Sequence, residues 1–285
     1  MRISDILLSE ELAIHEPALE VWLARMSPFY QKLAGSPMDV KLANDSQLTI
    51  GDFINQRRAY EVTSDGIAII HANDVLGSGL TNVDRILGAT DYDDLIGEFS
   101  QAGADSAVTG ILFDVNSPGG AVLGLQEARN AVVEARAQKP VVSHITMIGA
   151  SAAYGLAVGA NAVVASTSAI VGSIGTISTY SNVSGLLAQL GVKVEHLTGG
   201  DLKAAGTAYR DMTRAERDFL QGRVDKFSES FRGWVQSQRP GVEASSMRGQ
   251  WFTGSEALEL GLVDQIGGRG DALNALRALI SYGAR

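Results

Sequence analysis

The chain has 285 residues, of which 45% are hydrophobic and 19% charged, and its formal net charge is −9. This length supports a sizeable core in one large domain or two small ones. The acidic balance, without any basic run, argues against nucleic acid as a partner. Cysteine is absent, which excludes disulfides, cysteine nucleophiles and cysteine–zinc sites.

Residues 1–60 differ from the rest and are predicted to form a helical extension. Hydrophobic residues from Leu12 to Leu23 are spaced as in an amphipathic helix that starts or breaks near Pro17. The segment is either a cap packed on the main domain or a docking arm for a partner. No signal peptide is expected, since the first apolar run is short and acidic residues follow it. No membrane span is expected either, because the uncharged stretch 141–171 is rich in Gly, Ala, Ser and Thr.

Residues 61–285 form the second predicted unit, which alternates strands and helices. Its predicted strands cover 66–70, 108–115, 140–146 and 162–165, and its predicted helices cover 92–101, 125–138, 151–160 and 210–238. Thr213 and Glu216 have the spacing of a capping box at the start of the last helix. Residues 253–264 predict a capped short helix followed by a strand. Repeated strand–helix units indicate an α/β fold with mostly parallel pairing.

Ser151 lies in Gly-Ala-Ser-Ala-Ala-Tyr-Gly, residues 149–155, where a predicted strand passes into a predicted helix. Its small neighbours would let a substrate backbone approach a hydroxyl, which becomes a nucleophile once a base removes its proton. The alternative is an ordinary serine that caps an alanine-rich helix. Taken alone, the segment favours the capping interpretation.

Ser117-Pro118-Gly119-Gly120 is expected to end the strand 108–115. A Gly-Gly step adopts backbone conformations closed to other residues and leaves N–H groups uncovered. Such a group, together with the N–H of Ser151, could hold the negative oxygen of a tetrahedral intermediate. The alternative is a plain turn.

Lys203 lies in Gly-Asp-Leu-Lys-Ala-Ala-Gly, residues 200–206. A lysine that acts as a base must be neutral, and burial favours the neutral form. Leu202, Ala204 and Ala205 are uncharged and could line a dry pocket. The alternative is a surface lysine on a loop.

The four histidines offer no competing site. His144 lies in a predicted strand and is expected to pack in the sheet, which argues against a Ser-His-Asp triad. His15, His71 and His196 have no motif around them. No spacing of His, Asp and Glu indicates a metal, and no cofactor is expected.

The order of these motifs resembles that of the signal peptide peptidase A family of serine–lysine proteases. The order is Ser-Pro-Gly-Gly, the Ser151 segment, Lys203 and then Arg-Asp-Met-Thr at 210–213. Within that family it is most similar to the head-maturation proteases of tailed phages. The resemblance covers about residues 66–268. It implies a Clp protease/crotonase-like fold, with residues 61–285 as the protease domain. The chain departs from the family at Ala152 and Ala153, where glycines are usual, and in having no expected membrane anchor.

The resemblance also implies a role for each site residue. Ser151 would attack, Lys203 would accept and return the proton, and the N–H groups of Gly119 and Ser151 would form the oxyanion hole. Ser173, in Val-Gly-Ser-Ile-Gly at 171–175, would hydrogen-bond and orient the lysine.

An extended substrate with a small or apolar P1 residue would add to a strand edge near residues 67–73. The expected substrate-binding residues are Gly120, Ile69, Ile70 and His71.

The expected function is therefore an endopeptidase that processes phage scaffold or head proteins in the host cytoplasm, including the assembling procapsid. A ring-like homo-oligomer is expected, in which Lys203 reaches a neighbour's Ser151. The apolar stretch 163–177 either forms the contact between subunits or belongs to the core of one subunit. Any scaffold segment would be encoded separately or removed. Two alternatives stay open: a crotonase-type acyl-CoA enzyme and a non-catalytic capsid component.

Overall fold

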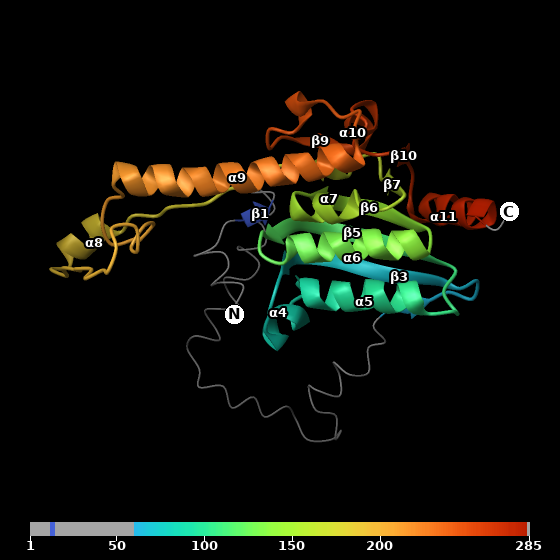
Figure 1. Cartoon of the computed structure of the whole chain (residues 1–285), viewed down its shortest axis with the longest axis horizontal. Helices are drawn as coiled ribbons and strands as arrows, with labels where there is room; N and C mark the ends of the chain where they lie inside the picture. The colour runs from blue at the N-terminus through green and yellow to red at the C-terminus, as the bar shows by residue number, and fades with distance from the viewer. Residues whose placement is uncertain (1–11, 15–59, 284–285) are drawn as a thin grey trace, which may run out of the picture.

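The computed structural model describes residues 12–14 and 60–283, and ten strands within these ranges form one sheet (Figure 1). The strands are β1 (Leu12–Ile14), β2 (Glu61–Val62), β3 (Ile67–Gly77), β4 (Thr90–Asp91), β5 (Gly110–Ala121), β6 (Val141–Ala150), β7 (Ala162–Ala165), β8 (Ile170–Gly172), β9 (Trp251–Thr253) and β10 (Gln265–Ile266). The helices are α4 (Asn82–Ile86), α5 (Tyr92–Ala104), α6 (Leu125–Gln138), α7 (Ala152–Ala157), α8 (Ser184–Gln189), α9 (Arg214–Gln238), α10 (Gly254–Glu259) and α11 (Arg269–Gly283), with a 3₁₀ turn at Ala244–Ser246.

The main path through the sheet runs β10-β7-β6-β5-β3-β2. Pairing is parallel from β3 through β5 and β6 to β7 and β10. Three pairs are antiparallel: β1 with β5, β2 with β3, and β9 with β8. The predicted α/β class with mainly parallel pairing is therefore confirmed.

Side chains on the central strands alternate between two apolar layers, as strand geometry requires. Ala68, Ile70 and Phe113 belong to the larger layer, which includes α5, α6 and α7. Their neighbours Ile69 and Leu112 belong to the smaller layer, which includes Ala272 and Leu276 of α11. Both faces of the sheet are covered, so the functional chemistry is confined to the strand ends.

Several strands and helices have other boundaries in the structure than the sequence predicted. β5 continues through Ser117-Pro118-Gly119-Gly120 to Ala121, although this motif was expected to end the strand. A register shift between Val115 and Ser117 lets the strand accommodate a proline, which cannot donate to the ladder. Leu12–Ile14 form a strand rather than the start of a helix, because an open edge of β5 pairs with them. The rest of the predicted extension, residues 1–11 and 15–59, lies outside the described residues.

The stretch 163–177, considered as a subunit contact, is largely core. Val163 and Val164 on β7, Val171 on β8 and Ile174 have no exposed surface. Of the two interpretations of this stretch, the structure therefore favours core for its large apolar side chains.

Residues 177–227 form a projecting segment, which we call the arm. It contains α8 and the first half of α9, and Figure 1 shows it reaching well beyond the sheet. The second half of α9 packs against the rest of the protease unit, which we call the body. Ser228 accepts a hydrogen bond from the N–H of Thr176, and Trp234 donates to the carbonyl of Gly155 at 2.7 Å. The predicted capping box of Thr213 and Glu216 is present at the start of α9.

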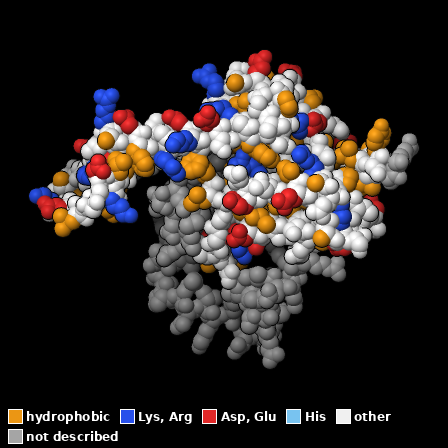
Figure 2. Space-filling model, viewed as in Figure 1, with side chains coloured by type: hydrophobic (Ala, Val, Ile, Leu, Met, Phe, Trp, Pro, Cys, Tyr) orange, Lys and Arg blue, Asp and Glu red, His pale blue; other side chains and the backbone are white. Residues whose placement is uncertain are grey.

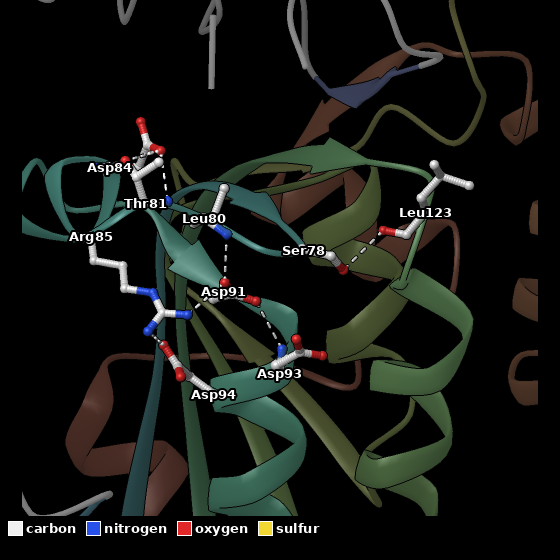
Figure 3. Close-up of polar contacts among 9 residues, drawn as sticks. All are labelled: Ser78, Leu80, Thr81, Asp84, Arg85, Asp91, Asp93, Asp94 and Leu123. Atoms are coloured by element: carbon white, nitrogen blue, oxygen red, sulfur yellow. Dashed lines mark hydrogen bonds and ion pairs between the residues drawn. The ribbon is translucent and has the colours of Figure 1, made fainter. Parts of the chain in front are cut away.

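A buried carboxylate holds the connection between β3 and α5 (Figure 3). Asp91 has no exposed surface, yet its Oδ2 accepts from the N–H of Leu80 at 2.8 Å and from Arg85 at 2.7 Å. Its Oδ1 accepts from the N–H of Asp93 at 3.0 Å. Asp94 also approaches Arg85, at 3.4 Å, but from the surface. The connection is therefore organised around Asp91.

We expect Asp91→Asn to lower the free energy of unfolding by about 2 kcal/mol, because one amide nitrogen would replace an oxygen that accepts hydrogen bonds and would leave buried donors unpaired. Asp94→Asn is the matched control, since its side chain is 48% exposed and contacts the same arginine. The control should change stability by under ~1 kcal/mol. Urea denaturation of both variants measures the difference, and equal losses would contradict the assignment.

Within residues 12–14 and 60–283, no helix combines the length and apolar character that crossing a bilayer requires.

Candidate functional site

The candidate site lies where β5 and β6 end together. Ser117 on β5 is opposite Gly149 on β6, so Gly119 and Ser151, each two residues further, reach the same level of the sheet. Ala150 on β6 is in turn opposite Gly172 on β8. Parallel pairing therefore brings Gly119, Ser151 and Ser173 to neighbouring strand ends, although they are far apart in the sequence.

Ser151 occupies a strained backbone conformation between β6 and α7, with φ 52° and ψ −122°. Within the part of the chain that the structure describes, the only other non-glycine residues with positive φ are Asp74 and Ser173. Such conformations cost of the order of 1–3 kcal/mol each and collect at functional sites. A strained serine at a sharp strand-to-helix turn also matches the geometry that presents a nucleophile in other hydrolases.

The Ser151 hydroxyl is both buried and unpaired. Its side chain makes no capping hydrogen bond to α7, so the interpretation as an ordinary helix cap is wrong. The residue is 1% exposed, and Oγ has no hydrogen-bond partner among the described residues. A buried hydroxyl without a partner costs about 1–3 kcal/mol, which is hard to explain by a structural role.

Gly119 is held in place by two residues without a predicted role. Its N–H donates to Ser117 Oγ at 3.1 Å, and the Ser117 hydroxyl donates to the carbonyl of Asp74. Gly119 has φ 106°, which a glycine adopts readily. The strained Asp74 and the buried Ser117 therefore fix the backbone beside Ser151.

The two N–H groups expected to form the oxyanion hole both have internal acceptors. The N–H of Ser151 donates to the carbonyl of Gly172 at 2.7 Å, continuing the ladder between β6 and β8. The N–H of Gly119 donates to Ser117 Oγ. Gly119 and Ser151 thus each lie two residues beyond the paired Ser117 and Gly149, and both of their N–H groups are occupied within the chain.

Ser173 follows Gly172, whose carbonyl binds the N–H of Ser151. Its own N–H donates to the carbonyl of Gln250 at 2.8 Å, and the side chain is 9% exposed. The structure therefore places Ser173 beside the predicted nucleophile, at a strained position of its own.

Of the predicted substrate-binding residues, the structure places only Gly120 at the site. Gly120 is opposite both Leu76 on β3 and Ala13 on β1, and a Cβ there would lie 1.8 Å from the Leu76 carbonyl oxygen.

Ile69, Ile70 and His71 lie in the middle of β3. They pair with residues 112–114 of β5, and Ile69 also pairs with Glu61 of β2. Ile69 and Ile70 are buried. This part of β3 offers no free edge at Ile69 and lies several residues before the strand ends at the site.

His144, the histidine nearest to Ser151 in the sequence, does not reach it. His144 Nδ1 lies 2.9 Å from Asp114 Oδ1, as in a catalytic pair, but His144 precedes Ser151 by seven residues, roughly 23 Å of extended strand. Burial alone would raise the pKa of Asp114, but the hydrogen bond with His144 and the charge of Arg269 hold it below its ordinary value. The pair belongs to the sheet, as expected for His144, and His15 lies outside the described residues.

Lys203 is exposed and lies in the arm, among the turns at 201–206. A Cβ on nearby Gly206 would lie 3.4 Å from Leu220 of α9. Leu220 precedes Ser228, where α9 meets the body, by eight residues or ~12 Å of helix. The structure therefore does not bring Lys203 to Ser151 within one chain.

Tyr92 and Ser78 hold the chain that follows Gly120, and sequence reasoning singled out neither. The buried Tyr92 hydroxyl donates to the carbonyl of Ala121 at 2.9 Å, directly after Gly120. The Ser78 hydroxyl donates to the carbonyl of Leu123 at 3.4 Å (Figure 3). No motif marks either residue, because their roles depend on the path of the chain between β3 and α5.

Among the described residues, no group of three or more His, Asp and Glu side chains could hold a metal ion.

Comparison with known proteins identifies the family. The model of peptidase family S49 matches residues 134–282, more than half of the chain. The capsid assembly protease C of Escherichia phage lambda is 30% identical over 225 residues, covering 78% of this chain and 51% of that protein. A Methanocaldococcus jannaschii protein provisionally named as a protease is 34% identical over 178 residues, covering 61% of this chain and 57% of that protein.

This chain belongs to peptidase family S49, as the predicted resemblance indicated. It spans about half the length of these two curated relatives. A crystal structure of an enoyl-CoA hydratase/isomerase family member is also similar, with a TM-score of 0.41 and 16% identity over 78% of this chain and 74% of that one.

We expect Ser151→Gly to be at least as stable as Ser151→Ala. Glycine normally costs about 0.5–1 kcal/mol relative to alanine, but at φ 52° it relieves strain of the order of 1–3 kcal/mol. Chemical denaturation of the two variants measures the order. Ser143→Gly against Ser143→Ala is the control, since this buried serine lies within β6 without positive φ, and there alanine should be the more stable. The same order at both positions would contradict the assignment of strain.

Proposed function

We propose that this chain is a serine endopeptidase in which Ser151 is the nucleophile and Lys203 of a neighbouring copy is the base. The observation that carries the proposal is the Ser151 hydroxyl, which is buried, unpaired and held on strained backbone at a strand-to-helix turn. Membership of a peptidase family supplies the reaction class.

The position of the arm supports a base supplied by another copy. Lys203 lies on the arm, away from the Ser151 of its own chain. The arm also exposes apolar side chains, among them Leu186 at 57%, Leu190 at 67% and Leu197 at 99%. Figure 2 shows hydrophobic side chains gathered on this projection. Removing such surface from water is favourable by roughly 25 cal/mol per Å², so a second copy is a suitable partner.

The reaction follows from these positions. Ser151 Oγ attacks the peptide carbonyl carbon while its proton passes to neutral Lys203 Nζ. Collapse of the tetrahedral intermediate breaks the C–N bond, and Lys203 gives the proton to the leaving amine. Water then attacks the acyl carbon while its proton passes to Lys203. Collapse of this second tetrahedral intermediate breaks the bond between the acyl carbon and Ser151 Oγ, and Lys203 returns the proton to Oγ.

The oxyanion needs donors during both steps. The N–H of Gly119 would leave Ser117 Oγ and turn to the substrate oxygen, because a glycine backbone can rotate and a neutral hydrogen bond at 3.1 Å is a modest loss. Ser173 would orient the incoming lysine, since Gly172 before it already contacts the backbone of Ser151.

The proposed substrates are proteins of an assembling phage head. A relative that covers 78% of this chain is named a capsid assembly protease, and no metal or cofactor is required by the dyad. Small or apolar P1 residues fit the small residues that surround Ser151. The host cytoplasm and the procapsid are the proposed locations.

We expect Ser151→Ala to abolish cleavage of scaffold or head proteins and to leave the circular dichroism spectrum unchanged, because only a hydroxyl without a partner is lost. Lys203→Arg should be nearly inactive, since a guanidinium stays protonated. Lys193→Arg is the control on the same arm, where the side chain is 86% exposed and pairs with Glu195 at 3.3 Å. If Lys203→Arg keeps more than about a tenth of the rate, a loss under ~1.4 kcal/mol, the base assignment is wrong.

We expect a mixture of Ser151→Ala and Lys203→Ala chains to regain part of the activity that each lacks alone. In a mixed oligomer some neighbouring pairs unite an intact serine with an intact lysine. Activity is measured after the two chains are co-expressed, and mass spectrometry verifies that they assemble together. Mixed oligomers without restored cleavage, or a fully active monomer in sedimentation, would overturn the arrangement between copies.

A further inference from the structure

We infer that residues 12–14 are an internal ligand of the peptide-binding edge beside Ser151, and that an external substrate must displace them. The pairing itself is a finding of the structure: Leu12 is opposite Ala121, Ala13 opposite Gly120 and Ile14 opposite Gly119, in antiparallel orientation. The assignment of this edge to substrate rests on the proposed function.

The sheet topology places β1 on the side of β5 that faces Ser151. A strand has two edges, and Val75 and Leu76 of β3 occupy one edge of β5 at Gly119 and Gly120. β1 therefore takes the other edge, which further back on β5 pairs with β6. Ile14 is opposite Gly119, and Gly119 is level with Ser151. A chain held there is extended and lies at the height of the nucleophile.

The edge is shaped to hold a peptide backbone. Tyr92 fixes the carbonyl of Ala121 from one side, and Gly120 lies against Leu76 too closely for a side chain. Main-chain pairing to such an edge binds extended chains of many sequences. The segment Leu-Ala-Ile at 12–14 is apolar, which fits the small or apolar P1 residues proposed for the substrate.

The other groups of the candidate site are also inaccessible to a substrate while β1 is paired with β5. Ser151 is 1% exposed, and the N–H groups of Ser151 and Gly119 are bonded internally while β1 holds the edge. β1 belongs to the same chain as the edge that it occupies. Its binding there is intramolecular, so weakly binding external peptides compete poorly.

The absence of cysteine makes a direct test possible. In the full chain, Leu12→Cys with Ala121→Cys places the only two thiols at directly opposite positions, where Cα atoms are about 4.5–5.5 Å apart and a disulfide fits. We expect mass spectrometry to find the cross-link after mild oxidation, with both single variants staying uncross-linked within the chain. Two free thiols in a folded chain would overturn the inference.

Two probes then distinguish occupation of the edge by β1 from the reactivity of Ser151. A peptidyl phosphonate carrying Leu-Ala-Ile needs the edge, and its labelling of Ser151 should fall at least about tenfold in the oxidised chain and recover on reduction. Unchanged labelling in the locked chain would overturn the role of β1 as a competitor. A small alkyl fluorophosphonate needs only the serine, so its failure in every state would count against Ser151 as nucleophile while the cross-link still decides the pairing.

A second variant opens the edge instead of locking it. In the double variant Leu12→Pro with Ala13→Pro, one lost N–H must face β5, because adjacent residues of a strand point their N–H groups to opposite sides. Labelling by the peptidyl phosphonate should rise severalfold. Leu42→Pro with Ala43→Pro makes the same change at an identical dipeptide outside β1 and should leave labelling unchanged. Equal rates in both double variants would contradict the inference.

Discussion

The register between β5 and β6 is the constraint on which the rest of the site depends. Because Ser117 is opposite Gly149, the residues two positions further, Gly119 and Ser151, reach a similar level of the sheet, with β1 along the edge of β5 at Gly119. A slip of one residue would turn every side chain of a strand to the other face and break both apolar layers. The core therefore holds the strained backbone of Ser151, and the cost of that strain is offset by burial elsewhere in the sheet.

The three strained residues lie around one point for the same reason. Asp74 lies at the register shift within β3, Ser151 directly follows β6 and Ser173 directly follows β8. Each is linked by a hydrogen bond to a neighbouring strand or loop. Asp74 and Ser117 hold Gly119, while Gly172 holds Ser151. Strain at a single residue could be accidental packing, but strain at three positions of one sheet indicates a backbone shaped for a purpose other than stability.

Sequence reasoning predicted the fold class and several elements well, because hydrophobic period and capping residues act locally. The strand at 162–165, the helix at 125–138 and the capping box of Thr213 all match the structure. It failed where tertiary pairing overrides local preference: the strand at Leu12–Ile14, the passage of β5 through Pro118, and the substrate edge placed near Ile69. Motifs also singled out Ser151 and Lys203 as candidates, but spacing in the chain could not show that the arm carries Lys203 away from the body.

The separation of Lys203 from Ser151 and the occupation of the edge by β1 have a common consequence. A chain alone would have a nucleophile without its base, and an edge already filled by its own segment. A neighbouring copy would supply the lysine, while a substrate held close by the same assembly would compete with β1 at a local concentration that a free cytoplasmic peptide does not reach. Proteolysis would then depend on assembly in two ways. Assembly would supply Lys203 from a neighbouring copy, and it would bring a substrate close enough to displace β1. That dependence suits the proposed function, in which the substrates are gathered in an assembling phage head.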